Sequence, residues 1–297
     1  MKKLITTLLL LLLSVPALST PAEPPLRLGI LAFRPKVQAL QQWLPLARHI
    51  EKSLGRRVQL SVYNYPDLNA AVQQKAVDIV LTNPGHYVLL RRRYDLSAPL
   101  ATQITQTGTH EMSSFGGVIF TRADETAINS LADLSGKLIA ATDIDSLGGY
   151  QMQAFEMLEA GLPLPNQDTF LATGMPHDRV EEAVLAGRAD AGFVRSGVLE
   201  SLVSENKLDL ARIKILNRQN HPAFPYIVST RLYPEWPVAV MPQVDEKIAR
   251  RLTVALLSLS SSSAAAHAAG ISGFKSAISL LGATRTTNAK SNFRKFC

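Results

Sequence analysis

Short apolar runs alternate with amphipathic stretches along most of the chain, and the two patterns predict different elements. Apolar runs bounded by turn residues predict strands at residues 26–31, 58–62, 78–81, 138–141, 170–172 and 191–194. Amphipathic stretches predict helices at residues 45–54, 68–75, 149–159, 178–186 and 244–259, and another just after Asn83-Pro84. Strands that alternate with helices are typical of parallel sheets covered by helices. The pattern therefore predicts an α/β fold.

A short internal repeat indicates that this plan is used twice. The Ala-Val pair at residues 71–72 precedes Asp78 by the same step as the Ala-Val pair at residues 183–184 precedes Asp190. An apolar strand follows each aspartate directly. Self-similarity of this kind is the sequence signature of a repeated structural unit, and it predicts two similar lobes.

The repeat aligns Asn83 with Arg195, and each stands at the end of a strand where a helix begins. Ligands of open α/β sheets bind at the carboxyl ends of the strands. Helix N-termini favour anions there, because their unpaired N–H groups and the helix dipole attract negative charge. We therefore expect an anion-binding cleft between lobe 1, residues 26–117 with 232–274, and lobe 2, residues 118–231.

The chain must pass twice between such lobes. The predicted crossings are two extended segments flanked by turn residues, 117–122 and 225–231. Two crossings imply a hinge, about which the lobes can close on a ligand.

The first 19 residues predict export. They combine a basic start, an apolar run at residues 8–13 and a small-x-small cleavage pattern at residues 17–19, which together are typical of a cleaved signal peptide. The apolar run is shorter than the roughly 20 residues that a membrane-spanning helix needs. No cysteine for lipid attachment follows it. The mature protein is therefore expected to be soluble in the periplasm.

Charge and cysteine content exclude several classes of function. The formal net charge of +7 comes from Lys2, Lys3 and the five basic residues of the acid-free tail at residues 275–297, so the body of the protein is balanced and no nucleic-acid partner is expected. The single cysteine, Cys297, excludes an intrachain disulfide and a cysteine-based metal site. No metal or cofactor is expected.

The sequence also lacks the common catalytic motifs. It contains no G-x-S-x-G nucleophile elbow, no G-x-x-x-x-G-K-[ST] phosphate loop and no H-E-x-x-H zinc pair. A hydrolase built from Ser146 and His177 remains a remote alternative, because no orienting carboxylate is marked for the histidine. We interpret the protein as a binding protein and not as an enzyme.

Six stretches in order carry a resemblance to a known family. They are residues 64–67, 78–84, 130–137, 145–150, 177–197 and 226–237. With them the sequence resembles the phosphate/phosphite/phosphonate-type periplasmic substrate-binding proteins, including the version used as the sensor domain of membrane histidine kinases. The resemblance implies the two-lobed type II periplasmic binding protein fold, with a hinge and an interlobe cleft.

The resemblance and the strand ends together define the candidate ligand-binding residues, for which a structural role is the alternative. In lobe 1 they are Arg34, Tyr65, Thr82, Asn83 and His86. In lobe 2 they are Ser146, Gly148, Gly149, Tyr150, His177, Arg195 and Ser196. Gly148 and Gly149 could serve only the turn into a helix, His177 could be a cap, and Arg195 could form a salt bridge across the lobe.

Two functions are consistent with the resemblance. In the first, the protein closes around a small oxyanion, phosphate-like or phosphonate-like, and delivers it to the membrane permease of an ABC-type transporter. In the second, it is a stand-alone or truncated sensor domain that reports the anion to a histidine kinase. Residues 226–237 favour the sensor version, and our hypothesis is that the tail at residues 275–297 is a divergent or frame-shifted end.

Overall fold

The computed structural model describes residues 23–32, 36–107 and 110–277. The predicted signal peptide, Arg34 and nearly all of the basic tail lie outside the described residues. Export, the ligand contact of Arg34 and the divergent tail therefore remain predictions. Among the helices within the described ranges, none combines the length and the apolar character that crossing a bilayer requires.

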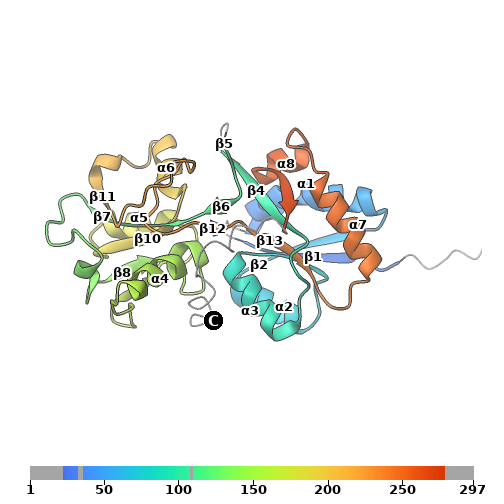
Figure 1. The fold of residues 1–297 in the computed structure, drawn as a ribbon, viewed down its shortest axis with the longest axis horizontal. Helices are drawn as coiled ribbons and strands as arrows, with labels where there is room; N and C mark the ends of the chain where they lie inside the picture. Colours follow the sequence, from blue (N-terminus) through green and yellow to red (C-terminus); the bar gives the residue numbers. More distant parts are fainter. Residues whose placement is uncertain (1–22, 33–35, 108–109, 278–297) are drawn as a thin grey trace, which may run out of the picture.

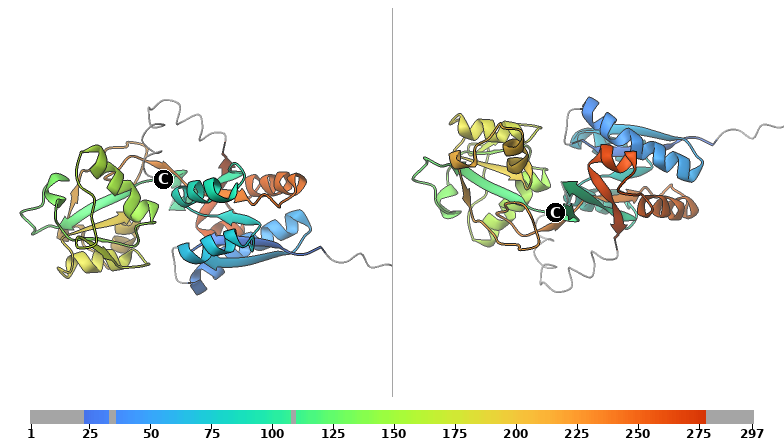
Figure 2. Two further views of the ribbon diagram at one scale, coloured as in Figure 1. Left: turned by 90° about the horizontal axis from the view of Figure 1, so that it is seen from below. Right: turned by 90° about the horizontal axis from the view of Figure 1, so that it is seen from above.

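The described chain forms two lobes joined by a thin connection (Figures 1 and 2). The sheet of lobe 1 has the strand order β14-β4-β13-β3-β1-β2, and β5 pairs with β4. Its strands are β1 (Leu26–Leu31), β2 (Val58–Tyr63), β3 (Ile79–Leu81), β4 (Ala101–Thr107), β5 (His110–Met112), β13 (Pro237–Val240) and β14 (Ile271–Ser276). Its helices are α1 (Lys36–Leu54), α2 (Tyr65–Gln73), α3 (Pro84–Tyr94), α7 (Glu246–Leu257) and α8 (Ala264–Ala269).

Lobe 2 has its own sheet, with the strand order β11-β7-β10-β8-β9. Its strands are β7 (Gly117–Arg122), β8 (Ile139–Ala141), β9 (Phe170–Ala172), β10 (Ala191–Arg195) and β11 (Ile213–Leu216). Its helical elements are η1 (Ala132–Leu134), the π-turn η2 (Leu147–Gln151), α4 (Met152–Glu159), α5 (Asp178–Leu185), α6 (Val198–Ser204) and η3 (Leu210–Arg212). The predicted two-lobed α/β architecture is therefore present.

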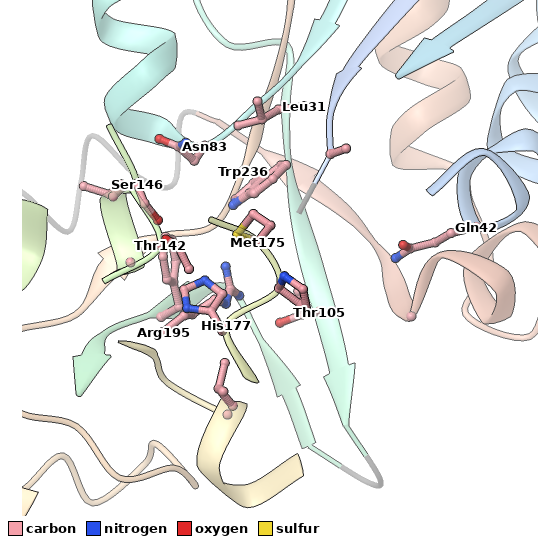
Figure 3. Close-up of a pocket in the computed structure, with 18 of the residues that line it drawn as sticks. Leu31, Gln42, Asn83, Thr105, Thr142, Ser146, Met175, His177, Arg195 and Trp236 are labelled. Atoms are coloured by element: carbon pink, nitrogen blue, oxygen red, sulfur yellow. The ribbon is translucent and has the colours of Figure 1, made fainter. Parts of the chain in front are cut away.

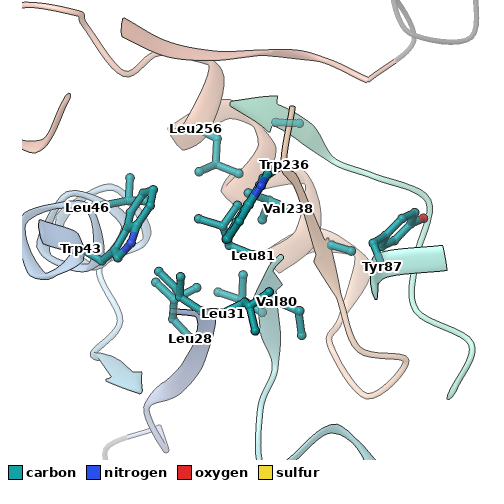
Figure 4. Packing of buried hydrophobic residues seen from close by; sticks show 14 of the residues in the cluster. Leu28, Leu31, Trp43, Leu46, Val80, Leu81, Tyr87, Trp236, Val238 and Leu256 are labelled. Atoms are coloured by element: carbon teal, nitrogen blue, oxygen red, sulfur yellow. The ribbon is translucent and has the colours of Figure 1, made fainter. Parts of the chain in front are cut away.

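The core of lobe 1 lies between its sheet and α1 and α7 (Figure 4). The central strands β1 and β3 are buried almost throughout, which is why they appear in the sequence as unbroken apolar runs. Trp43 of α1 and Trp236, which precedes β13, both belong to this core. Both also line the space between the lobes, so the packing of lobe 1 shapes its ligand-facing surface.

The predicted start of the first helix at Pro45 is wrong. Helix α1 begins at Lys36, and Pro45 lies inside it. A proline within a helix removes one backbone hydrogen bond and crowds the preceding turn. The helix continues through it because an apolar stripe before and after the proline is buried against the sheet, formed by Ala39, Trp43, Leu46, Ala47, Ile50 and Leu54.

The crossings between the lobes lie a few residues away from the predicted segments. Strand β7 pairs with both β10 and β11, so residues 117–122 belong to the sheet of lobe 2. Residues 225–231 also stay on lobe 2, because the Ser229 hydroxyl accepts a hydrogen bond from Ile119 N at 2.9 Å. The chain passes between the lobes at β6 (Ser114–Phe115) and β12 (Tyr233–Pro234), which pair antiparallel as a two-stranded ribbon.

The internal repeat corresponds to a repeated structural device. Asp78 Oδ2 accepts from Arg27 N at 2.9 Å, and Asp190 Oδ2 accepts from Leu138 N at 2.8 Å. The backbone N–H of each aspartate donates back to the same residue's carbonyl, at 2.8 Å in both lobes. Each aspartate therefore holds the start of the neighbouring strand, and the strand ends that follow occupy equivalent places in the two lobes.

We expect Asp78→Asn to destabilise the protein more than Asp190→Asn. Asp78 also accepts from the Arg27 side chain, at 2.9 Å from Nε and 2.7 Å from Nη2. Loss of the charge should cost about 1–3 kcal/mol in the free energy of unfolding measured in urea at pH 7. Burial raises the pKa of Asp78, but the Arg27 bonds outweigh it and leave the pKa below 3.8.

The contribution of the Asp78 charge is therefore present above pH 3.8, the ordinary value for an aspartate, and is lost as the pH falls below it. The difference between wild type and Asp78→Asn should shrink at acid pH. Equal losses for both variants at pH 7 would contradict the assignment of extra stability to the Arg27 pair.

Candidate functional site

A cleft of about 810 Å³ lies between the lobes (Figure 3). Its walls come from the ends of β1, β3, β8 and β10 and from the segments that follow them, as expected for two sheets whose carboxyl edges face each other. The candidate residues that line it are Tyr65, Asn83, Ser146, Gly148, His177, Arg195 and Ser196. Thr82, His86, Gly149 and Tyr150 are not among the residues that line it.

Thr82 and His86 lie behind the wall of lobe 1. Both are buried. A hydrogen bond of 2.9 Å joins Thr82 Oγ1 to His86 Nδ1, and His86 Nε2 lies 3.0 Å from Asn69 Oδ1. Both ring nitrogens are thus occupied within the lobe, and burial lowers the pKa of His86 to about 4. The structure therefore places this histidine as a neutral packing residue, away from a ligand in the cleft.

Gly149 and Tyr150 shape the site from behind. A Cβ on Gly149 would lie 2.7 Å from Thr142 Oγ1 and 2.8 Å from both Ser146 Oγ and the His177 ring, so no larger residue fits between these side chains. Tyr150 packs edge-to-face on Phe170 with ring centroids 5.2 Å apart. It belongs to the core of lobe 2 and not to the cleft.

The start of the helix in lobe 2 offers backbone donors to the cleft. The π-turn η2 continues directly into α4, so residues 147–159 form one helical segment. Ser146 Oγ accepts from Gly149 N at 3.2 Å and caps this segment. Within the described residues, the N–H groups of Leu147 and Gly148 donate to no protein acceptor. Two unpaired donors at the positive end of a helix are suited to an anion.

Thr142 is a candidate site residue that the sequence analysis did not identify. It directly follows β8, it is 1% exposed, and it lines the cleft. Its Oγ1 is buried and has no hydrogen-bond partner in the described part of the chain. A buried hydroxyl without a partner is unfavourable unless a ligand or water satisfies it. The position of Thr142 at a parallel strand's carboxyl end was the available signal.

Arg195 at the end of β10 has two roles. It lines the cleft, and its guanidinium also forms an ion pair with Glu235. The guanidinium carbon lies 4.0 Å from the centre of the Phe115 ring. Phe115 belongs to the ribbon strand β6, and Glu235 directly follows β12. Arg195 therefore forms a salt bridge as well as lining the cleft, but to the segment that connects the lobes and not across lobe 2.

Tyr65 and Asn83 form the facing wall of lobe 1. Asn83 caps α3 by accepting from His86 N at 2.9 Å, and its Nδ2 donates to the Tyr65 hydroxyl at 2.7 Å. Burial, followed by the nearby Asp143 and Asp145 charges, raises the pKa of Tyr65, so the hydroxyl stays protonated and can donate.

The lobes also touch through apolar contacts at the helix start. Leu147 of lobe 2 is 3% exposed and packs in the hydrophobic cluster of lobe 1. A Cβ on Gly85 of α3 would lie 3.4 Å from Leu147 Cδ1 and 2.8 Å from Gln151 Oε1. The structure therefore shows the lobes in contact at one end of the cleft. A larger residue at position 85 would have to displace the end of the Gln151 side chain.

These features agree with one protein family. Residues 28–278 match the family described as the ABC transporter, phosphonate, periplasmic substrate-binding protein. The chain belongs to this family. The match covers both lobes and the ribbon between them, and the resemblance inferred from the sequence is confirmed.

Two relatives of the chain are a sensor kinase and an import protein. The tetrathionate sensor histidine kinase TtrS of Salmonella typhimurium is 32% identical over 234 residues, 77% of this chain and 38% of that protein. The phosphate-import protein PhnD of Mycolicibacterium smegmatis is 25% identical over 178 residues, 57% of this chain and 53% of that protein. The chain thus spans about half or less of the length of these relatives.

A solved structure supports the fold. XAC2383 from Xanthomonas citri, bound to chloride ion, superposes with a TM-score of 0.71 at 20% identity and covers 91% of this chain and 98% of its own. At this identity the likeness concerns the fold. The expected two-lobed periplasmic binding protein fold is confirmed.

His86 should give the protein a specific loss of stability in mild acid. Its pKa falls from the ordinary value of 6.5 to about 4 on folding. The unfolded chain therefore takes up the proton first, and the stability that neutral His86 confers is present above pH 6.5 and is lost as the pH falls toward 4. We expect up to about 3 kcal/mol of this loss to disappear in His86→Gln.

The measurement is urea unfolding of wild type and variant at several pH values between 7 and 4. His267→Gln, which replaces an exposed histidine, controls for the substitution itself. Parallel pH profiles for wild type and His86→Gln would show that His86 is not held neutral in the folded protein.

Proposed function

We propose that this protein binds a small oxyanion in the interlobe cleft and closes its two lobes around it. The observation that carries the proposal is the group of neutral donors at the helix start of lobe 2. The N–H groups of Leu147 and Gly148 and the buried hydroxyl of Thr142 have no partner among the described residues. Hydrogen bonds to a charged group contribute about 1.5–3 kcal/mol each, which a ligand anion would supply here.

Closure follows from the division of the site between the lobes. Thr142, Ser146 and Gly148 belong to lobe 2, whereas Tyr65 and Asn83 belong to lobe 1. An anion that contacts both walls stabilises the closed arrangement over the open one, because it gains the second set of contacts only on closure. The paired ribbon β6 and β12 is the element about which the lobes would move.

Several observations support binding without catalysis. Ser146 Oγ accepts the Gly149 N–H as a helix cap, which differs from a nucleophile activated by a base. The family is one of substrate-binding proteins. We therefore propose a periplasmic carrier, exported by residues 1–19, that delivers its ligand to the permease of an ABC-type transporter.

A second candidate is a sensor that reports the anion to a signalling partner. It is favoured by one observation, the 32% identity to TtrS over 234 residues, which exceeds the 25% identity to PhnD. Both functions use the same cleft and the same closure. A strain that lacks the gene for this protein distinguishes the two functions. Loss of ligand uptake in that strain indicates the carrier. Loss of the transcriptional response to the ligand, with uptake intact, indicates the sensor.

A thermal-shift screen tests the proposal directly. The mature protein is titrated with phosphate, phosphite, methylphosphonate, methanesulfonate, tetrathionate and acetate. A ligand at about 100 times its Kd should stabilise the protein by about 2.7 kcal/mol. The absence of a shift with every one of these anions would count against the oxyanion cleft.

A matched pair of variants locates the binding site. Thr142→Val removes a cleft hydroxyl without a partner, whereas Thr82→Val removes a buried hydroxyl that already bonds His86. We expect Thr142→Val to weaken the best ligand by roughly 10-fold to 100-fold, as loss of a charged hydrogen bond predicts. Thr82→Val should lower stability and leave affinity within about 2-fold. The reverse order would place the anion elsewhere.

A further inference from the structure

Arg195 is held by a carboxylate that is almost completely buried. Glu235 is 1% exposed and lies next to β12, on the chain segment that connects the lobes. It accepts from Arg195 Nη2, from Gln103 Nε2 at 3.2 Å and from Thr105 Oγ1 at 3.4 Å. All three donors line the cleft, so the carboxylate stands directly behind the ligand-facing wall.

The backbone keeps Glu235 in this position. Its N–H donates to Ser113 O at 3.0 Å, and the preceding residues pair with β6. Arg195 is equally constrained, because its guanidinium stacks over Phe115 of that strand. Neither charged group can swing away from the other without disturbing the ribbon between the lobes.

The pair can still donate hydrogen bonds, although its net charge is zero. A guanidinium has five N–H donors in a planar fork, and the Arg195 side chain is 26% exposed. The charges around it do not restore a positive field. Lys36 is the other lysine or arginine among the described residues that line the cleft, and the acidic lining residues are Asp67, Asp143, Asp178 and Glu205. Lys207, which does not line the cleft, pairs with Asp178 and Glu205, so Asp67 and Asp143 supply the negative charge that a ligand meets.

We propose that Glu235 determines which charge state of a ligand the cleft prefers. By neutralising Arg195, it makes the cleft favour an oxyanion group with one negative charge over a group with two. The inference rests on the proposed function and adds the ligand class, namely sulfonates, monoesters and singly protonated phosphonates. One negative charge is balanced by neutral donors and the Arg195 N–H groups. A second charge meets the repulsion of the lining carboxylates Asp67 and Asp143 in a medium less polar than water.

The test compares two ligands of nearly the same shape. At pH 9 methanesulfonate carries one negative charge and methylphosphonate carries mainly two, because a sulfonic acid has one ionisable proton and a phosphonic acid has two. Calorimetric titration gives the ratio of their Kd values. Wild type should bind methanesulfonate more tightly. Glu235→Gln, which keeps an acceptor for Arg195, should shift the ratio toward methylphosphonate by roughly 10-fold or more.

Glu156→Gln is the matched control. Glu156 is also a buried glutamate paired with an arginine, since it accepts from Arg231 Nε at 3.0 Å, and Arg231 lies 4.5 Å over the Phe155 ring. It is not among the residues that line the cleft. Its replacement removes one negative charge from the protein without touching the site, so the Kd ratio should stay within about 2-fold of wild type.

The outcomes are distinguishable. If wild type binds neither ligand, and no other oxyanion, the proposed function itself fails. If wild type binds an oxyanion but prefers the dianion, or if Glu235→Gln and Glu156→Gln change the ratio equally, the assignment to Glu235 is wrong. Should Glu235→Gln fail to fold, the double variant Arg195→Gln/Glu235→Gln replaces it. This variant removes both charges and should retain the wild-type preference, and a shift toward the dianion would overturn the inference.

Discussion

The geometry of the cleft depends on one buried side-chain amide. Gln153 on α4 is 0% exposed, and its Nε2 donates to Gly148 O at 2.8 Å and to Val194 O at 2.9 Å. Gly148 belongs to the helix start, and Val194 directly precedes Arg195. The Gln153 amide therefore fixes the position of the helix-start N–H groups relative to Arg195. Strand β7 can pass beside this amide only with a glycine, because a Cβ on Gly117 would lie 2.4 Å from Gln153.

The two lobes reach the cleft by the same construction but present different chemistry. Asp78 and Asp190 each fix the start of a strand through the backbone. The aligned residues further on are Asn83, which caps a helix, and Arg195, which pairs with Glu235. A shared scaffold thus provides hydroxyl and amide groups on one side and helix N–H groups with a neutralised arginine on the other. Binding by hydrogen bonds follows from this arrangement more directly than binding by net charge.

The sequence patterns predicted the positions of helices and strands better than they predicted which side chains face the cleft. The strands at 26–31 and 170–172 were predicted with the bounds that the structure has. For β1 the reason is that a buried parallel strand is a continuous apolar run, whereas β9 is only partly buried. The start of α1 was wrong, since packing of the helix outweighed the local preference of Pro45. At the strand ends, residue type could not tell which side chains face the cleft. Thr82 and Thr142 each directly follow a buried strand, yet of the two only Thr142 lines the cleft, because tertiary packing decides which hydroxyl finds an internal partner.

The central claim is that the backbone donors of the helix start bind the anion. Nuclear magnetic resonance of ¹⁵N-labelled protein tests it most directly, through the amide signals of Leu147 and Gly148 during titration with the best oxyanion. Both signals should move downfield and exchange more slowly with solvent on binding, because each N–H gains an acceptor. Saturable binding that leaves these two signals unchanged would contradict the account.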